Sequence, residues 1–466
     1  MRIYNTLSGK KEELVPLREG EISMYVCGPT VYNFFHIGNA RPLVVFDTMR
    51  RYLQYRGYKV KYVQNFTDVD DKIINRAREE GCTAPEIAEK YIEEYFKDTA
   101  ALNVKKADVH PKVSEHIPEI MKFVKDLVDK SFAYEADGDV YFSTRKFPEY
   151  GKLSGQNIDD LESGARIAIG EVKKDPLDFA LWKGRKEEDE IAWESPWGMG
   201  RPGWHIECSA MAKKHLGATI DIHAGGQDLQ FPHHENEIAQ SECCNGAPFA
   251  RYWMHNAYIT MNRQKMSKSK GNFFTVRDIR KTYTGEEIRF FLLSGHYRSP
   301  IDFGEDLMKQ ARASLERLHN CKENLLYLTE SGKAGDMTAS EKEVRDGYET
   351  YRNRFIDVMD DDLNTADGIS VVFELVTAIN SAVRADTTAE FAKKSLETLM
   401  EFADVLGILQ IEEDNSVDEE IRKLVDERQQ ARKDKNFARA DEIRDMLRER
   451  GITLKDTPQG VQIVKE

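Results

Sequence analysis

Two short segments of this sequence carry residues suited to binding phosphate groups. The first is His36-Ile37-Gly38-Asn39, which stands where an expected strand gives way to an expected helix. A helix N-terminus presents unpaired N–H groups and the positive end of the helix dipole, and both favour an anion. Gly38 would let a nucleotide approach the backbone closely, and His36 and Asn39 can donate hydrogen bonds to phosphate or ribose oxygens. Alone, this tetrapeptide is a weak indication of nucleotide binding.

The second segment is a lysine-rich string, KMSKS, at residues 265–269. Lys265 and Lys268 stand three residues apart among small hydroxyl residues, and Gly271 follows them. Such a cationic loop can neutralise the charge that develops on a leaving pyrophosphate. A generic run of lysines is more simply a solvated basic turn. Together with the upstream His-Ile-Gly segment, however, this string is far more specific than either alone, and the pair indicates chemistry at the phosphates of a nucleotide.

A third group of residues offers the donor atoms of a zinc site. Cys27, Cys208, His233 and Glu237 provide two soft and two harder ligands. His233 and Glu237 are four apart on an expected helix, so they share one face. Because the four are scattered along the chain, buried thiols and a capping histidine remain the alternative to a metal. The six cysteines are too sparse and irregular to suggest a disulfide framework.

Alternating strand and helix patterns would position these residues. An apolar run at 22–26 predicts a strand that ends at Cys27, and a helical pattern follows over 38–55. Further candidates are strands at 60–66, 219–223 and 252–260 and a helix at 233–244. This order predicts a parallel α/β sheet with the ligand groups at the carboxyl ends of its strands.

The remaining chain predicts a modular protein. The fold class we expect is α/β, with a Rossmann-like parallel-sheet catalytic domain split by an insertion, then an α-helical bundle and a small C-terminal α+β domain. Turns are frequent in the insertion, helical patterns rich in Leu, Glu, Lys and Arg follow residue 304, and an acidic link lies at 412–416. The expected boundaries are 1–110 and 198–304 for the two halves of the catalytic domain, 111–197 for the insertion, 305–411 for the bundle and 419–466 for the C-terminal domain.

Composition and charge limit the partners. The net charge of -14 repels polyanions, so a nucleic acid must be met by local basic patches, such as residues 428–439 near the C-terminus. The start of the sequence has no continuous apolar segment typical of a signal peptide, and no stretch of eighteen apolar residues occurs. We therefore expect a cytoplasmic protein that does not span a membrane.

The pair HIGN and KMSKS resembles the signature motifs of the class I aminoacyl-tRNA synthetases, where the first motif usually reads HIGH. Asn39 departs from that pattern at its last position. The asparagine amide can still donate a hydrogen bond, but it cannot take up a proton as histidine can. Longer strings closely resemble the cysteinyl-tRNA synthetase family, and the resemblance spans essentially the full chain: MYVCGPTVYN, NFTDVDDKI, GRPGWHIECSAM, HAGGQDLQFPHHENEIAQSE and NFARADEIRDML.

The resemblance implies a cysteine–tRNA ligase with ATP, L-cysteine and cysteine tRNA as partners and Mg²⁺ accompanying ATP. It implies one zinc ion on Cys27, Cys208, His233 and Glu237, which the substrate thiol joins. A shape pocket separates cysteine from serine by only about 1–3 kcal/mol, whereas zinc prefers a thiolate strongly. By the same resemblance Trp204 lines the cysteine pocket, with an ordinary core residue as the alternative. Thr67 and Asp228 stand in expected strand-end loops, where they could hold the substrate ammonium, with a helix cap as the alternative for Asp228. The expected ATP-binding residues are His36, Gly38, Asn39, Lys265 and Lys268, and His36, Lys265 and Lys268 are expected to serve catalysis. Arg432, Lys433, Lys435 and Arg439 are expected phosphate contacts for the tRNA, and we expect a monomer.

Two other functions stay open at this point. One is an ATP-dependent ligase that joins cysteine to a small amine, as the related mycothiol-pathway ligase does. The 160-odd residues after Gly304 count against it. The other is a non-catalytic tRNA-binding paralogue, which would have no use for intact zinc ligands or an intact KMSKS string.

Overall fold

The computed structural model forms two compact units, Met1–Leu409 and Gln410–Glu466. It describes residues 1–157, 172–188, 190–261, 264–265 and 274–410, and, in the second unit, 421, 424–425, 427–432, 434, 436–449, 452–457 and 460–465. The division at Leu409 lies close to the expected end of the helical bundle at residue 411. The other expected domain boundaries stay predictions.

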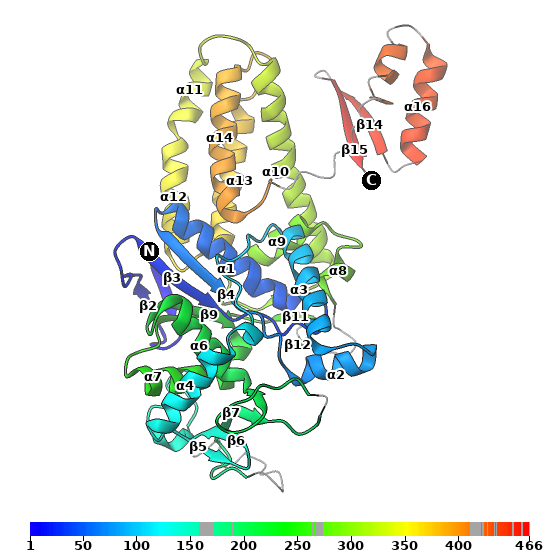
Figure 1. Ribbon diagram of the computed structural model, residues 1–466. Coiled ribbons are helices and arrows are strands. Elements are labelled where there is room, and N and C mark those ends of the chain that lie inside the picture. Colours follow the sequence, from blue (N-terminus) through cyan, green and yellow to red (C-terminus); the bar gives the residue numbers. More distant parts are fainter. Residues whose placement is uncertain are drawn as a thin grey trace. The chain divides into compact units, whose positions relative to one another are not determined.

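A four-stranded parallel sheet forms the centre of the first unit (Figure 1). Its order is β10-β9-β3-β4, with bounds Ala250–Asn256, Ile220–Gly226, Glu21–Val26 and Lys59–Gln64. The chain passes from β3 to β4 on one side and later returns to β9 on the other side of β3. The strand order therefore reverses between β3 and β9, which is where parallel α/β sheets bind ligands, outside the carboxyl ends of the strands.

Alternating strand residues supply two cores, one on each face of the sheet. Met24 and Val26 belong to the core that contains helix α1, whereas Tyr25 between them belongs to the core of α6 and α7. The helices around the sheet are α1 Ile37–Tyr55, α2 Asp71–Glu80, α3 Ala84–Ala101, α6 Trp204–Leu216, α7 Glu235–Asn245, α8 Val276–Ile279 and α9 Gly285–Leu293. Helices therefore cover both faces of the sheet, as is usual for parallel sheets, and each of its four strands contributes buried residues.

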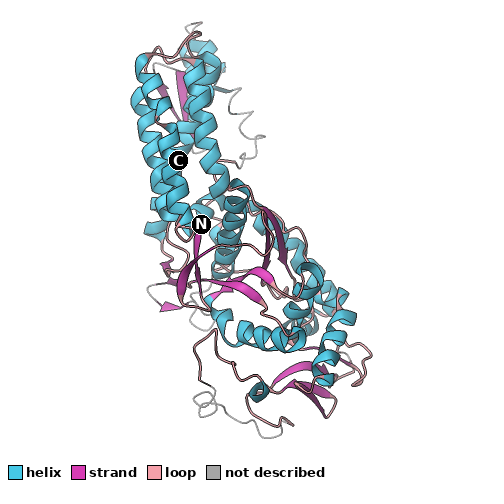
Figure 2. Ribbon diagram, turned by 90° about the vertical axis from the view of Figure 1, so that its left-hand side faces the viewer, coloured by secondary structure: helices cyan, strands magenta, loops and turns pink. Residues whose placement is uncertain are grey.

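An insertion with its own sheet separates the two halves of the parallel sheet, as we expected. It contains helix α4 Ile117–Asp129 and an antiparallel sheet of β5 Ala133–Ala136, β6 Asp139–Phe142, β7 Phe179–Gly184 and β8 Gly200–Pro202. The last strand of this sheet, β8, lies beyond the expected boundary at residue 197. Figure 2 shows this small sheet at the end of the unit opposite the long helices.

The long helices of the first unit form the expected bundle. They are α10 Glu305–Ser331, α11 Ala339–Asp346, α12 Tyr348–Asp360, α13 Thr365–Ala382 and α14 Ala389–Leu406. Smaller sheets pair β1 Arg2–Asn5 with β2 Lys10–Glu13, and β11 Ile259–Met261 with β12 Gln264–Lys265 and β13 Ile301–Asp302. In the second unit, helix α16 Phe437–Glu449 precedes an antiparallel pair, β14 Ile452–Thr457 with β15 Gly460–Lys465, in keeping with the expected α+β domain.

One expected strand is wrong in extent. The sequence predicts a single strand over 252–260, but β10 ends at Asn256 and a separate sheet begins at Ile259. The N–H of Ala257 donates to the carbonyl of Tyr297 at 2.9 Å, which takes the chain out of the parallel sheet. Among the described residues, no helix is both long and apolar enough to cross a bilayer.

Candidate active site

The carboxyl ends of β3 and β9 bring distant segments into contact. The N–H of Cys27, the first residue after β3, donates to the carbonyl of Ala224 on β9 at 3.2 Å. Gly28 follows, and a Cβ atom there would lie 1.6 Å from the carbonyl oxygen of Asn65, which only glycine avoids. Asn65 directly follows β4, so the close approach of the ends of β3 and β4 depends on a glycine beside Cys27.

The four expected zinc ligands meet at this point. Cys27, Cys208 on α6, His233 in the turn before α7 and Glu237 on α7 place one ligand atom each within 4.8 Å of one another. The two sulfurs are 3.8 Å apart, and Nε2 of His233 lies 3.7 Å from the Cys208 sulfur. Oε1 of Glu237 lies 3.0 Å from that nitrogen and 3.4 Å from the Cys27 sulfur. The cluster is a candidate metal site.

These separations fit a tetrahedral metal. With Zn–S bonds of about 2.3 Å, two sulfurs of a tetrahedron lie about 3.8 Å apart, and a sulfur and an imidazole nitrogen lie about 3.5 Å apart. Cys208 and His233 are 2% exposed and Glu237 is fully buried, so without a cation the cluster would hold a carboxylate and a thiol away from water. Burial of charge is costly unless it is compensated, so the donor set fits zinc both in its chemistry and in its spacing.

The protonation of the donors also suits a cation. The hydrogen bond that the Cys27 thiol donates lowers the pKa of Cys208 to about 6, which makes Cys208 a thiolate at neutral pH. Burial acts to raise the pKa of Glu237, but His223 and His233 outweigh it and hold that pKa well below the usual value. Burial acts to lower the pKa of His233, yet the Glu237 carboxylate raises it to about 10. A metal must therefore displace protons from Cys27, whose pKa burial raises, and from His233.

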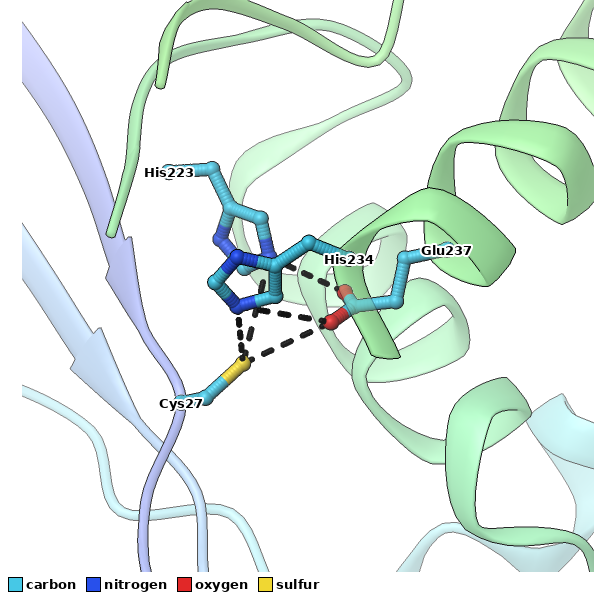
Figure 3. A group of neighbouring side chains, drawn as sticks. All are labelled: Cys27, His223, His234 and Glu237. Carbon is cyan, nitrogen blue, oxygen red and sulfur yellow. Dashed lines mark hydrogen bonds and ion pairs between the residues drawn. The ribbon is translucent and has the colours of Figure 1, made fainter. Parts of the chain in front are cut away.

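A second set of donors overlaps the first (Figure 3). Cys27, His223, His234 and Glu237 also place one ligand atom each within 4.8 Å of one another. The Cys27 sulfur lies 3.3 Å from Nε2 of His234 and 3.9 Å from Nε2 of His223, and Oε2 of Glu237 lies 3.0 Å from the latter nitrogen. This set replaces the thiolate-forming Cys208 with imidazole. The set with two sulfurs is therefore the better match to zinc.

The sequence analysis did not single out three of the histidines in this region. Nδ1 of His205 lies 2.9 Å from Nδ1 of His233, and Nε2 of His255 lies 2.8 Å from Nδ1 of His234. His223 is fully buried within β9. The signal available in the sequence was an imidazole within an expected strand of the parallel sheet, at His223 and again at His255. Such partners fix the orientation of metal-ligating imidazoles.

The His-Ile-Gly segment forms the N-terminus of α1, as the sequence predicts. His36 is the N-cap residue, and its Nδ1 accepts the backbone N–H of Asn39 at 3.3 Å. In a neutral ring this leaves the proton on Nε2, so His36 presents a donor. A Cβ atom at Gly38 would lie 2.8 Å from Nδ1 of His36, which explains the glycine. The first turn of α1 contains no acidic residue, so the positive end of the dipole is not neutralised there.

Backbone pairing ties both flanks of the lysine-rich segment to this region. Lys265 ends strand β12, where it pairs with Thr260 of β11; its side chain and Lys268 lie outside the described residues. On the other flank, Thr275 forms an antiparallel bridge with His36, and the N–H of Ile37 donates to the carbonyl of Phe274 at 3.2 Å. The structure thus places Phe274 and Thr275, which follow the lysine-rich string, against the His-Ile-Gly segment, more than 200 residues away in the sequence.

One cavity of about 410 Å³ connects the metal-ligand cluster with the α1 N-terminus, because Cys27, His36, Gly38 and Asn39 all line it. Two of the three expected substrate contacts, Trp204 and Asp228, line it as well. The Trp204 ring is 40% exposed and lies 4.4 Å from the His233 ring, between centroids. The third, Thr67, does not line the cavity; it is 2% exposed and donates to Oε2 of the buried Glu207 at 2.9 Å.

The expected tRNA contacts lie in the second unit. Arg432 is exposed, whereas Lys433 and Lys435 lie outside the described residues. Arg439 forms ion pairs with Glu427 and Glu442, both at 2.8 Å, so part of its charge is already compensated. Nearby, Phe437 begins α16 with 61% of its surface exposed, more than any other large apolar residue of the described chain. The sequence analysis did not single out this side chain.

Comparison with known sequences finds three family domains in the chain. The tRNA synthetases class I (C) catalytic domain matches residues 13–313, the DALR domain matches 354–410, and the cysteinyl-tRNA ligase anticodon binding domain matches 414–463. In structure, the chain resembles the Mycobacterium tuberculosis methionyl-tRNA synthetase in complex with methionyl-adenylate, with a TM-score of 0.60 and 13% identity over 83% of this chain and 89% of that one. It also resembles the LeuRS of Agrobacterium radiobacter K84 in its ternary complex, with a TM-score of 0.61 and 10% identity over 85% of each chain.

The fold, the paired motifs and the matched catalytic domain together define a class I aminoacyl-tRNA synthetase. Within this class, the chain is 57% identical to the cysteine–tRNA ligase of Clostridioides difficile (strain 630) over 462 residues, which cover 99% of both sequences. The chain therefore belongs to the cysteinyl-tRNA synthetase family.

Proposed function

We propose that this chain activates L-cysteine with ATP to cysteinyl-adenylate and transfers the cysteinyl group to the 3′-terminal adenosine of cysteine tRNA. The observation that carries this proposal is the shared cavity, which Cys27 lines together with His36 and Gly38. An amino acid whose side chain reaches the donor cluster and a nucleotide whose phosphates reach the α1 N-terminus would meet in that cavity. The family membership supports the same reading.

The chain's own residues have positioning and electrostatic roles in the first step. A carboxylate oxygen of cysteine attacks the α-phosphorus of ATP, an O–P bond forms, the bond to the bridging oxygen breaks, and pyrophosphate leaves. Nε2–H of His36 and the N-terminus of α1 bind the phosphates, which Mg²⁺ accompanies, and Lys265 and Lys268 neutralise the leaving pyrophosphate. The exposed carboxylate of Asp228 suits the substrate ammonium, and Trp204 forms a wall beside it. Thr67 does not line the cavity, so it would act on the substrate only indirectly, through the residues that form the cavity wall.

Zinc is the metal that the donor set favours. Cys27, Cys208, His233 and Glu237 would hold it, and it would supply a preference for a thiolate over a hydroxyl at the side-chain end of the cavity. That preference explains how one protein could separate cysteine from serine, although the two differ by a single atom.

The test is charging of total tRNA with radiolabelled cysteine and ATP, run beside radiolabelled serine. We expect charging with cysteine and none with serine. Cysteine-dependent adenylate formation without transfer to tRNA would instead identify a ligase for a small amine. Binding of tRNA with neither reaction would identify a non-catalytic paralogue. The expected monomeric state and the expected cytoplasmic location stay predictions.

The second unit supports a prediction about tRNA recognition. Exposed aromatic rings bind nucleic-acid bases by stacking, at about 1–3 kcal/mol per base, and Phe437 is such a ring beside Arg439. We expect Phe437→Ala to raise the KM for tRNA about tenfold and to leave cysteine-dependent pyrophosphate exchange, which needs no tRNA, at the wild-type rate. Leu17→Ala, which removes an exposed apolar residue from the first unit, is the control. An unchanged KM for tRNA in the Phe437 variant would contradict the assignment.

A further inference from the structure

Two arginines of the first unit, Arg41 and Arg289, are completely buried. Arg289 on α9 pairs with the carboxylate of Asp47 at 2.8 Å. Arg41 on α1 is different, because no carboxylate of the described residues lies within ion-pair distance of its guanidinium. Its Nη1 instead donates to the carbonyls of Ala257 at 2.7 Å and Tyr258 at 3.0 Å. Its Nη2 donates to two further carbonyls, those of His296 at 3.1 Å and Ser299 at 2.6 Å.

This arrangement is a costly way to hold a protein together. A buried charge without a counter-ion loses its hydration, and apolar residues of similar volume often join two elements more stably. Nε of Arg41 has no partner in the described part of the chain, which adds to the cost. Burial lowers the pKa of Arg41 to about 10, so the side chain still carries its charge at neutral pH. Such a group needs a reason other than stability.

The location of Arg41 supplies a reason other than stability for its burial. It lies four residues after Ile37, the first residue of α1, which is about one helical turn or 6 Å along the helix. The two carbonyls that its Nη1 binds belong to Ala257 and Tyr258, which line the cavity together with Ile259. These residues follow directly after the carboxyl end of β10. The guanidinium therefore connects the cavity wall formed by the His-Ile-Gly segment with the wall formed by residues 257–259.

We propose that Arg41 is a positioning residue for the binding of ATP. From within α1, Arg41 binds the carbonyls of Ala257 and Tyr258 and so fixes the distance between these two walls of the cavity. The inference rests on the proposed function, since it takes the nucleotide to lie between these walls. Arginine is required because its planar fork reaches four carbonyls at fixed angles, whereas the ammonium of lysine is a single point charge. The nucleotide site therefore depends on the planar geometry of the Arg41 guanidinium and not on its charge alone.

The test is the cysteine-dependent exchange of pyrophosphate into ATP by the full chain, measured for Arg41→Lys. We expect the KM for ATP to rise about tenfold, the effect of losing one or two buried hydrogen bonds, while the KM for cysteine stays within about twofold of the wild-type value. A merely structural arginine would lower the melting temperature and the active fraction without separating the two KM values.

Arg289→Lys is the matched control, because Arg289 is equally buried and also binds backbone carbonyls, those of Leu406, Leu102 and Asn103, none of which lines the cavity. It should lower the melting temperature and leave the KM for ATP unchanged. If Arg41→Lys does not fold, Arg41→Gln removes the buried charge, keeps one amide donor and is measured in its place. A wild-type KM for ATP in the Arg41 variant, or the same rise in the Arg289 variant, overturns the inference. Absence of exchange in the wild-type protein would instead refute the proposed function.

Discussion

Cys208→Ser is expected to remove zinc from the protein and to lower the rate of cysteine activation by about a thousandfold, which corresponds to about 4 kcal/mol. At position 208 the chain holds a thiolate at neutral pH, because the hydrogen bond from Cys27 lowers the pKa of Cys208 to about 6. A serine hydroxyl stays protonated there and is a poor zinc ligand. Zinc content by atomic absorption and pyrophosphate exchange with cysteine measure the two effects.

Cys244→Ser is the control for the removal of a buried thiol. Cys244 is 4% exposed, on the same α7 helix as Glu237, but it belongs to neither donor set. We expect this variant to keep both its zinc and its activity.

Zinc content also distinguishes between the two overlapping donor sets. A Cys208→Ser protein that keeps zinc, together with a His234→Gln protein that loses it, would place the ion on the set drawn in Figure 3 instead.

His36→Ala has the second largest expected effect, a fall of about a hundredfold to a thousandfold in the rate of adenylate formation. Removal of one preorganised donor from a site where charge develops has an effect of this size. The alanine also deprives the Asn39 N–H of its side-chain acceptor at the start of α1. Rapid-quench measurement of cysteinyl-adenylate in single turnovers isolates this step, and the KM for cysteine should change little because His36 is not among the donor residues.

His36→Asn separates the two roles of this histidine. Asparagine is a good N-cap residue and keeps an amide donor, so it preserves the start of α1. We expect the asparagine variant to fold with wild-type stability and to regain part of the rate. If alanine and asparagine were both as fast as the wild type, the phosphates would not contact His36.

The sequence by itself determined the local elements and supplied one set of candidate metal donors. The apolar run before Cys27 and the helical pattern after Gly38 depend on neighbouring residues only, and both elements form where the patterns predict them. The strings around Cys27, Cys208, His233 and Glu237 were sufficient to propose one donor set. These features could be read because backbone propensity, side-chain periodicity and capping act over a few residues.

The tertiary structure decided which distant residues meet, because the order of the strands, and not their distance along the chain, sets their contacts. Cys27 and Cys208 are 181 residues apart, and Arg41 and Ala257 are 216 apart, yet both pairs are in contact. No local pattern could reveal that His223 and His234 form an alternative to Cys208 and His233, or that Thr67 faces Glu207 rather than the cavity. Those relations arise only when β9 pairs with β3 and β10 with β9, because the parallel sheet brings the carboxyl ends of its strands to one edge.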